Sequence, residues 1–346
     1  MPSTSAPLVS VVTPVYNGAN YLEQCIESVI SQTYQSWEYL IVDNCSTDRS
    51  SEIAAAYAAK DERIRVVRND KNLPAVDNWN LALGLVSAET GYCRILHADD
   101  YLFPNCLSRM VELGEANPSV IIVSSSVLVE KTFAKSGLKK SGIANVELFS
   151  GSSVRTGREA ARLYLLSELP RTCTPSSLLI RWGPRRRERL LYDASTGIRS
   201  ALDRQAFLEL LQEGDFGFVD EVLTCAREHP LSMTSRVYLG VSSAEKLLLL
   251  RRFSSVYLTV DEYNDMWNRE LSLYYQFLGR SVFLLRGFDF WQFHSNRLRE
   301  LGCPISYLQL VFNALREFGM AIRDMLSGYE RGLPPQMQRR TAPPAN

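Results

Sequence analysis

The chain has 346 residues, of which 46% are hydrophobic and 22% charged, and its 38 basic and 38 acidic side chains give no formal net charge at pH 7. These fractions are those of an ordinary globular protein, and no overall field attracts nucleic acid, although residues 185–187 form a local basic cluster. The seven cysteines are widely spaced and form no Cys-x-x-Cys pair, which excludes a disulfide framework and a zinc site as expectations.

The two ends of the chain, residues 1–7 and 333–346, are predicted to be disordered, the latter because it is rich in Pro, Gln and Arg. The first residues lack the basic start and apolar core of a signal peptide, and no run approaches the roughly 18 apolar residues that span a bilayer. We therefore expect a cytoplasmic protein that is not integral to the membrane, with peripheral contact at the inner face left open.

Strand and helix patterns alternate through residues 8–125. Short apolar, β-branched runs predict strands at residues 8–13, 39–42, 64–67, 92–96 and 120–123. Between these runs, apolar side chains recur at helical spacing, and Asn20 is expected to cap the first helix. This alternation predicts an α/β fold, with a mostly parallel sheet sandwiched by helices.

Two adjacent carboxylates, Asp99 and Asp100, follow the predicted strand at 92–96, and Pro104 suits the first turn of the next helix. In open α/β sheets, ligands bind at the carboxyl ends of strands. Neighbouring carboxylates repel unless a cation offsets their charge, and oxygen ligands suit Mg²⁺ or Mn²⁺, which favours a diphosphate as the third partner. A solvated turn with a helix cap explains the same pair equally well.

The pattern is less regular after residue 126. Lys, Ser and Gly at 130–153 predict a long loop or a weak hairpin, and long loops in compact domains are often functional lids. Thr156 and Glu159 match a capping box, residues 177–180 and 216–222 are predicted strands, and residues 201–211 a helix.

Residues 241–332 are predicted to be a helical region. Its expected helices are 245–253, 261–278 and 305–326, and Ser242 and Glu245 match a capping box. Aromatic side chains are frequent here, and at helical spacing they indicate a packed core. The alternative is a face that lies on a membrane or binds another copy of the chain.

Three segments carry a family resemblance: residues 11–17 (Val-Val-Thr-Pro-Val-Tyr-Asn), 42–48 (Val-Asp-Asn-Cys-Ser-Thr-Asp), and 97–100 (His-Ala-Asp-Asp) followed by Pro104. In this order and spacing they resemble the family 2 inverting glycosyltransferases of the GT-A fold, while the glycine fingerprints of dinucleotide and P-loop proteins are absent. The resemblance implies a glycosyltransferase domain over 8–240, with a nucleotide-sugar half at 8–125 and an acceptor half at 126–240.

The resemblance implies that the ends of the first two strands hold the nucleobase and ribose of a nucleotide sugar. The residues that it assigns to nucleotide-sugar binding are Pro14, Val15, Tyr16, Asp43, Asn78, His97, Ala98, Asp99, Asp100 and Arg227. A carboxylate at position 43 can accept a hydrogen bond from uracil or thymine, and Tyr16 can stack. We interpret nearby Asp48 as a helix cap only.

Metal binding is expected at Asp99, with Asp100 in a supporting role. The family commonly carries an acid two positions before the metal-binding Asp, where this chain has His97, so His97 either binds nucleotide or metal or closes the strand through its backbone. Arg227 and His229 resemble the Arg-x-His element near the diphosphate, which makes His229 a second expected metal ligand.

Asp203 is the expected catalytic base, although the family's usual neighbouring Glu is Leu202 here. The expected activity is transfer of a sugar, dependent on Mg²⁺ or Mn²⁺, from a UDP- or dTDP-type donor to a hydroxyl of a glycan, a lipid-linked or a small-molecule acceptor, as in polysaccharide biosynthesis. A non-catalytic binding partner of the same fold and, more distantly, a nucleotidyltransferase are the alternatives.

Overall fold

A computed structural model describes residues 6–132, 139–144, 153–169, 174–183, 189–198, 201–229, 241–284 and 286–326. Contacts divide the described chain into two units, the first ending at Glu228 and the second beginning at His229. Of the two ends predicted to be disordered, residues 1–5 and 333–346 lie outside the described residues, as does the basic cluster at 185–187.

The first unit begins with alternating strands and helices, as predicted. These are β1 (Leu8–Val15), α1 (Ala19–Ile30), β2 (Trp37–Asp43), α2 (Ser50–Ala58), β3 (Ile64–Arg68), α3 (Ala75–Gly84), β4 (Thr90–Ile95), β5 (Tyr101–Leu102), α4 (Cys106–Ala116) and β6 (Val120–Thr132). There follow β7 (Lys139–Ala144), β8 (Val154–Arg155), α5 (Gly157–Leu165), η1 (Pro175–Ser177), β9 (Leu178–Arg181), η3 (Ala194–Thr196), α6 (Leu202–Leu210) and β10 (Asp215–Glu228).

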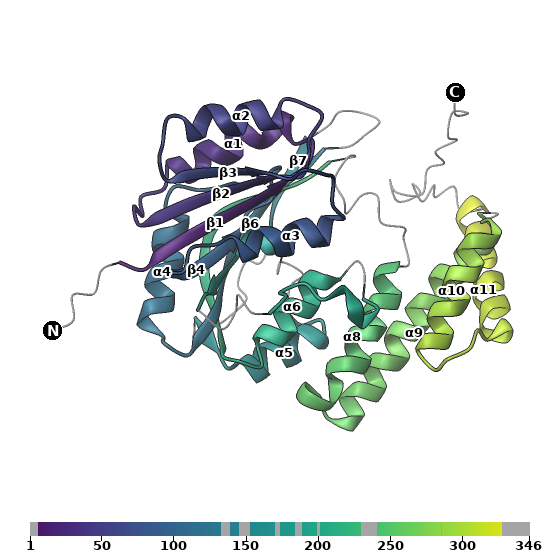
Figure 1. Cartoon of the computed structure of the whole chain (residues 1–346). Helices are drawn as coiled ribbons and strands as arrows, with labels where there is room; N and C mark the ends of the chain where they lie inside the picture. Colours follow the sequence, from purple (N-terminus) through teal and green to yellow (C-terminus); the bar gives the residue numbers. More distant parts are fainter. Residues whose placement is uncertain are drawn as a thin grey trace. The chain divides into compact units, whose positions relative to one another are not determined.

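These strands form one mixed sheet in the order β3-β2-β1-β4-β9-β6-β10-β5, with β7 paired to β6 and β8 to β10. The pairs β3-β2, β2-β1, β1-β4 and β6-β10 are parallel, and β9 runs antiparallel between β4 and β6. Helices α1 and α2 cover one face of β1–β3, and α3 lies on the other face (Figure 1). The predicted α/β class is therefore confirmed.

The core on the α1 side follows from period-two alternation along β1. Val9, Val11 and Val15 of β1 are fully or almost fully buried with apolar side chains of α1, α2 and α4. The intervening residues Ser10 and Val12 point to the other face, as strand geometry requires. Because both faces are covered, β1 reads as a continuous apolar run.

The cap of α1 is not the predicted Asn20. The helix begins at Ala19, whose N–H donates to Oδ2 of Asp48 at 3.0 Å, and the N–H of Gly18 donates to Ser50 Oγ at 2.9 Å. Asn20 was expected because it directly precedes the apolar helical pattern. The hydrogen bonds at the helix start instead come from Asp48 and Ser50, in the loop after β2.

The segment predicted as a loop or a weak hairpin contains a hairpin. β6 extends to Thr132 and pairs antiparallel with β7, with Val127 opposite Ala144. Residues 133–138 and 145–152, where a lid was predicted, lie outside the described residues. Ahead of α5, Thr156 Oγ1 accepts from the N–H of Glu159 at 3.2 Å, as half of the predicted capping box requires.

The second unit contains four helices in its described residues: α8 (Val241–Tyr257), α9 (Val260–Val282), α10 (Phe288–Glu300) and α11 (Tyr307–Leu326). Its buried cluster includes Leu247, Tyr274 and Leu298, with Phe277 and Phe290 packed against it. These aromatic side chains belong to a core, as the first interpretation predicted. No helix of the described residues is long and apolar enough to cross a bilayer.

Ion pairs add to this apolar cluster. Lys246 of α8 binds the nearly buried Glu270 of α9 at 2.5 Å, and Arg297 of α10 lies 3.8 Å from the fully buried Glu245 of α8. The predicted cap at Ser242 falls on side chains that are not described. A capping box that the sequence reading missed begins α9 at Thr259.

Candidate active site

The carboxyl ends of β1, β2 and β4 lie at one edge of the sheet, because these strands are parallel and aligned. The register pairs Val15 with Asp43 and Val12 with Ile95. The loops after all three strands therefore start from the same edge, where α/β sheets bind ligands. Since β3 pairs with β2, Arg68 lies opposite Asp43 in the same row.

Asp43 carries a buried oxygen without a hydrogen-bond partner. Its side chain is fully buried; Oδ1 accepts from the N–H of Ser46 at 3.1 Å, and Oδ2 lies 3.6 Å from Arg68 Nη1, beyond hydrogen-bond distance. A buried acceptor of this kind costs stability unless a ligand or water satisfies it. Tyr16, after β1, is 54% exposed and offers a free ring.

The loop after β1 is held in place by the loop after β2. Asn17 adopts a left-handed φ of 53°, and its Oδ1 accepts from the N–H of Thr47 at 2.8 Å. A Cβ on Gly18 would lie 2.8 Å from Val15 Cγ2 and 3.2 Å from Ala98 Cβ, so a side chain there would collide with its neighbours. This close approach brings Ala98 next to the end of β1.

Asp48 has a structural role in this loop. It accepts from the N–H groups of Ala19 and Ser50, each at 3.0 Å, and from Ser50 Oγ at 2.6 Å. Partial burial tends to raise the pKa of Asp48, but these hydrogen bonds hold it below its usual value. The geometry is that of the helix cap that we inferred for this residue.

Asn78 lies in a buried amide network. Its Oδ1 accepts from Asn69 Nδ2 at 2.8 Å, and Asn69 also donates to Asn44 at 2.9 Å. Asn44 accepts from the N–H of Leu73 and donates to its carbonyl. These bonds hold the loop after β3 against the end of β2, so Asn78 positions the loop, and its contact with a donor stays a prediction.

His97, Asp99 and Asp100 form one cluster in which the potential ligand atoms all lie within 4.8 Å of one another. Burial and the neighbouring Asp99 raise the pKa of Asp100 to about 6, with His97, Ser176 and Arg227 acting in the opposite direction. A second carboxylate held this close is unfavourable without positive charge. The cluster therefore fits a divalent cation.

The His97 ring is held between a carboxylate and an indole. Its Nδ1 lies 3.9 Å from Asp100 Oδ2, its Nε2 is buried without a hydrogen-bond partner, and the ring stacks on Trp79 at 5.7 Å between centroids. The backbone N–H of His97 donates to Ser176 Oγ at 3.0 Å. Two ligand atoms that each lie about 2.2 Å from one ion are at most about 4.4 Å apart. The ligand atoms here lie within 4.8 Å of one another, so small side-chain rotations would bring them to that separation.

Arg227 of β10 crosses the acidic loop. Its N–H donates to Asp100 Oδ1 at 2.9 Å, and its Nη1 donates to the carbonyl of Asp99 at 2.8 Å. Nη2 donates to Gln24 at 2.5 Å, and Nε binds Glu130 at 3.3 Å. The guanidinium is thus fixed beside the cluster, where it adds positive charge; its contact with a diphosphate stays a prediction.

Arg94 is a feature of the site that the sequence reading missed, because it was counted within an apolar strand. The side chain is fully buried and donates to the carbonyl of Ser176 and to Thr224 Oγ1. Burial lowers the pKa of this guanidinium, and Cys106 and Asp100 oppose the shift. No carboxylate forms an ion pair with Arg94 among the described residues. Its positive charge still interacts with Asp100 of the acidic loop.

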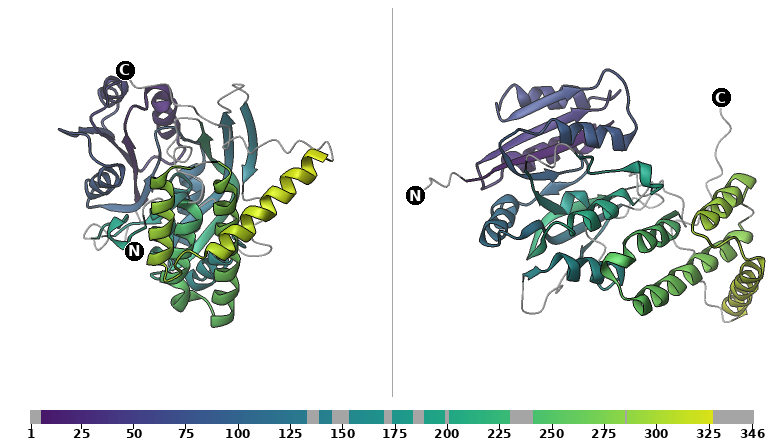
Figure 2. Two further views of the ribbon diagram at one scale, coloured as in Figure 1. Left: turned by 90° about the vertical axis from the view of Figure 1, so that its right-hand side faces the viewer. Right: turned by 60° about the horizontal axis from the view of Figure 1, so that its bottom comes forward.

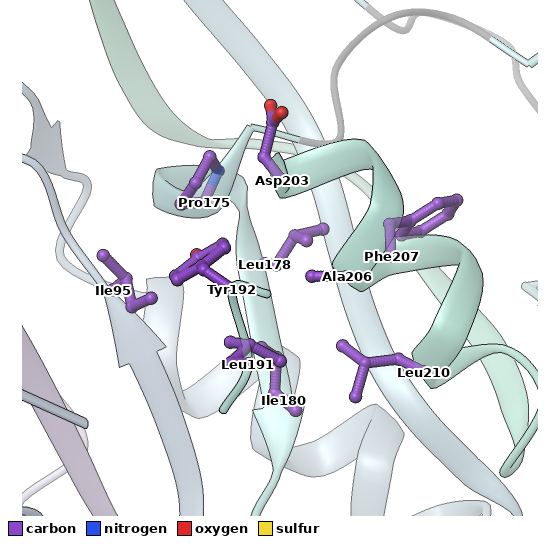
Figure 3. Close-up of a pocket in the computed structure, with 10 residues that line it drawn as sticks. All are labelled: Ile95, Pro175, Leu178, Ile180, Leu191, Tyr192, Asp203, Ala206, Phe207 and Leu210. Carbon is purple, nitrogen blue, oxygen red and sulfur yellow. The ribbon is translucent and has the colours of Figure 1, made fainter. Parts of the chain in front are cut away.

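Asp203 stands in the first turn of α6, above a small apolar cavity (Figure 3). Its carboxylate points away from the apolar side chains that line the cavity (Figure 3). The cavity of about 10 Å³ holds no more than one water molecule, so it is not a sugar pocket. Burial raises the pKa of Asp203, and Arg204, the helix N–H groups and His97 oppose that shift.

Trp79 lies between Asp203 and the His97-Asp99-Asp100 cluster. Its ring stacks on His97 and meets Tyr192 edge-on at 5.4 Å, and Tyr192 lines the cavity beneath Asp203. The neighbouring Asn80 exchanges two hydrogen bonds with the backbone of Tyr192, at 2.8 and 3.1 Å. Helix α3 therefore fixes both ends of this arrangement, which the sequence reading missed; Trp79 itself is half-buried.

His229 is the first residue of the second unit and is not part of the described His-Asp-Asp cluster. Its assignment as a metal ligand stays a prediction.

A sequence model described as Glycosyl transferase family 2 matches residues 10–166, which include β1, β2 and the acidic cluster. Over these residues the chain is similar to glycosyl transferase family 2. The match ends within the first unit, and residues 167–346 lie beyond it.

Curated relatives match about a third of the chain. The putative teichuronic acid biosynthesis glycosyltransferase TuaG of Bacillus subtilis is 41% identical over 106 residues, which are 31% of this chain and 41% of TuaG. Glycosyltransferase GlyG of Streptococcus pneumoniae is 31% identical over 118 residues, 34% of this chain and 38% of GlyG. The matched region is thus about two fifths of each relative's length.

Solved structures share the fold over more of the chain. S. aureus TarS 1-349 in complex with UDP has a TM-score of 0.56 at 17% identity and covers 85% of this chain and 79% of its own. A mannosyltransferase from Pyrobaculum calidifontis has a TM-score of 0.51 at 14% identity, and the match covers 94% of this chain and 83% of the mannosyltransferase. The chain therefore has the GT-A fold predicted for it.

Proposed function

We propose that the chain is a metal-dependent, inverting glycosyltransferase that moves a sugar from a nucleoside-diphosphate sugar to a hydroxyl group. The observation that carries this proposal is the cluster of His97, Asp99 and Asp100, crossed by Arg227 and within electrostatic reach of Asp203. It combines a site for a divalent cation and a diphosphate with a carboxylate suited to remove a proton.

A UDP- or dTDP-type donor is supported by the residues at the ends of β1 and β2. Asp43 Oδ2, which accepts no hydrogen bond in the protein, can accept one from the ring N–H of uracil or thymine, and the exposed ring of Tyr16 can stack on the base. Pro14 and Val15 form the strand end beside them. Among proteins of this fold, TarS binds UDP, and the mannosyltransferase binds GDP-Man and Mn²⁺.

Asp99 and Asp100, with His97, would hold the metal. A divalent ion supplies positive charge against the departing nucleoside diphosphate. An imidazole ligand favours a transition-metal ion such as Mn²⁺ over Mg²⁺, which prefers oxygen ligands and retains water. The Arg227 guanidinium lies where it would add charge to the same diphosphate, and His229 follows two positions later.

In this proposal Asp203 takes the proton from the acceptor hydroxyl as that oxygen attacks the anomeric carbon. A single displacement inverts the configuration of the sugar, and its transition state has oxocarbenium character. The raised pKa of Asp203 suits a general base, because proton transfer is most efficient when the pKa approaches the working pH. The alternative Glu221 is less suited, since it is paired with Arg109 at 2.7 Å.

The acceptor is proposed as a hydroxyl of a growing glycan, with lipid-linked and small-molecule acceptors as further candidates. Support comes from TuaG, whose name places it in teichuronic acid biosynthesis. The matched region covers only part of each relative, so the acceptor half of this chain must define its own specificity.

The test is release of nucleoside diphosphate by the purified chain from a panel of nucleotide sugars, with and without Mn²⁺, Mg²⁺ and hydroxyl acceptors. We expect release that requires both metal and acceptor. Asp99→Asn should abolish metal-dependent nucleotide binding without changing the circular dichroism spectrum, and exposed Asp70→Asn is the matched control.

Three results would contradict the proposal. Nucleotide binding without any turnover would indicate a non-catalytic binding protein of the same fold. Release of pyrophosphate would indicate a nucleotidyltransferase, and unchanged Mn²⁺ dependence in Asp99→Asn would remove the metal site from this cluster.

A further inference from the structure

Helix α11 exposes a row of large apolar side chains. Leu308, Val311, Leu315, Phe318 and Ile322 are 86%, 55%, 65%, 52% and 39% exposed, and the steps between them alternate between three and four residues. We call these five residues the α11 seam. Three-four spacing is typical of two helices that pack knobs into holes. Tyr307 and Phe312, which are 72% and 66% exposed, widen the apolar face beside the seam.

The opposite side of α11 is already used. A Cβ on Gly279 of α9 would lie 2.8 Å from the carbonyl carbon of Asn313 and 2.9 Å from the nitrogen of Ala314, so the two helices cross with their backbones in close approach. Arg280 of α9 binds Glu317 at 2.7 Å on the same side. Because α9 holds α11 there, the seam is presented by a fixed helix, at the edge of the helical unit (Figure 2).

An apolar groove lies beside the seam. Its lining is formed by the end of α9 and by α11: Val282, Phe283, Leu310, Val311, Ala314, Leu315 and Phe318. The groove has a volume of about 430 Å³, and the rings of Phe283 and Phe318 stack at 5.9 Å along it. A large side chain from a facing helix can therefore enter between α9 and the seam.

The positions that flank the seam carry no charge. They are Phe312 and Gly319 on one side and Tyr307 and Ala314 on the other. In paired helices these positions usually hold the charged residues that select a partner, so here nothing repels an identical helix. Arg316 and Arg323 lie beyond Phe312 and Gly319 on the polar border, as basic residues do in helices that bind membrane surfaces, so a lipid surface is the competing occupant in the test.

We propose that two copies of this chain associate through the α11 seam, related by a two-fold axis. A two-fold contact needs one self-complementary patch, which an uncharged apolar seam provides. A specific interface buries about 800 Å² on each partner, and a buried aromatic side chain contributes about 150–250 Å². Phe312, Phe318 and the aliphatic residues of the seam supply an area of this order. The proposal is independent of the catalytic assignment.

Light scattering or sedimentation of the full chain, over a range of micromolar concentrations, tests the proposal. We expect the wild type to have twice the 39.1 kDa mass of one chain. The double variant Leu308→Glu/Leu315→Glu should be monomeric with an unchanged circular dichroism spectrum, because both side chains are exposed and not part of the fold's core. Val260→Glu, on a 75% exposed residue of α9 outside the seam, is the matched control and should stay dimeric.

A wild type that is monomeric at every concentration overturns the proposal, and so does a double variant that keeps the dimer mass. A monomeric wild type that sediments with phosphatidylserine vesicles, and loses that binding in the double variant, would show that the seam binds a lipid surface instead.

Discussion

At the scale of single residues, the site depends on polar groups that the fold buries without satisfying them. Asp43 Oδ2 and His97 Nε2 are buried and have no hydrogen-bond partner, and Arg94 is a buried charge without an ion pair among the described residues. Each costs free energy in the unliganded chain. Binding of a donor and a cation would satisfy the first two. The unliganded fold therefore carries a cost that ligand binding would remove.

Asp43→Ala should weaken binding of uridine and thymidine diphosphates. Loss of one hydrogen bond to a charged acceptor costs about 1.5–3 kcal/mol, or roughly ten- to a hundredfold in affinity. Titration calorimetry measures this, with exposed Asp70→Ala as the control. Wild-type affinity for both nucleotides in Asp43→Ala would place the nucleobase elsewhere.

Asp203→Asn should leave donor affinity nearly unchanged, because a general base acts on the acceptor. Turnover should fall by roughly 10²–10⁴-fold, as measured by release of nucleoside diphosphate. If Asp203 is only a charge at the start of α6, the variant should lose about 0.3–1 kcal/mol of stability and keep near-normal turnover. In that case the base must be sought among Asp193, Asp220 and Glu221.

At the scale of elements, the starts of α9 and α1 are capped in different ways. The start of α9 is encoded locally, since Thr259 Oγ1 accepts from the N–H of Glu262 at 3.3 Å and Glu262 accepts from the N–H of Thr259 at 2.9 Å. The start of α1 is encoded at a distance, by Asp48. A substitution at a local cap therefore tests a helix alone.

Thr259→Ala should lower the free energy of unfolding by about 0.5–2 kcal/mol, because the first turn of α9 loses its capping oxygen. Chemical denaturation followed by circular dichroism measures the loss, and Thr259→Ser, which keeps the oxygen, should restore most of it. An unchanged midpoint in Thr259→Ala would mean that packing on α8 and α11 fixes the start of α9 without the cap.

At the scale of the whole molecule, the helical unit should become less stable in acid. His294 is buried, its Nδ1 lies 2.5 Å from Tyr274 Oη, and burial lowers its pKa from 6.5 to about 4. Between these values the unfolded chain binds a proton that the folded chain does not, so stability is complete above pH 6.5 and falls as the pH falls towards 4. A shift of this size corresponds to about 3 kcal/mol.

The measurement is denaturant unfolding at a series of pH values between 4 and 7, and His294→Gln is the comparison because it keeps a hydrogen-bond acceptor for Tyr274. The variant should lose most of the pH dependence that the wild type shows in this range. Equal pH dependence in both proteins would assign the effect to other groups.

The sequence by itself determined the alternation of strands and helices and the positions of the acids at strand ends, because side-chain periodicity and turn residues act over a few neighbours. Tertiary structure decided which distant residues meet. Arg94 reaches Ser176 and Thr224, and Trp79 connects His97 to the cavity beneath Asp203, only because β9 and β10 return beside β4 and β6. The exposure of α11 was likewise decided by packing: contact with α9 on the side of Asn313 and Glu317 leaves the apolar side of the helix uncovered.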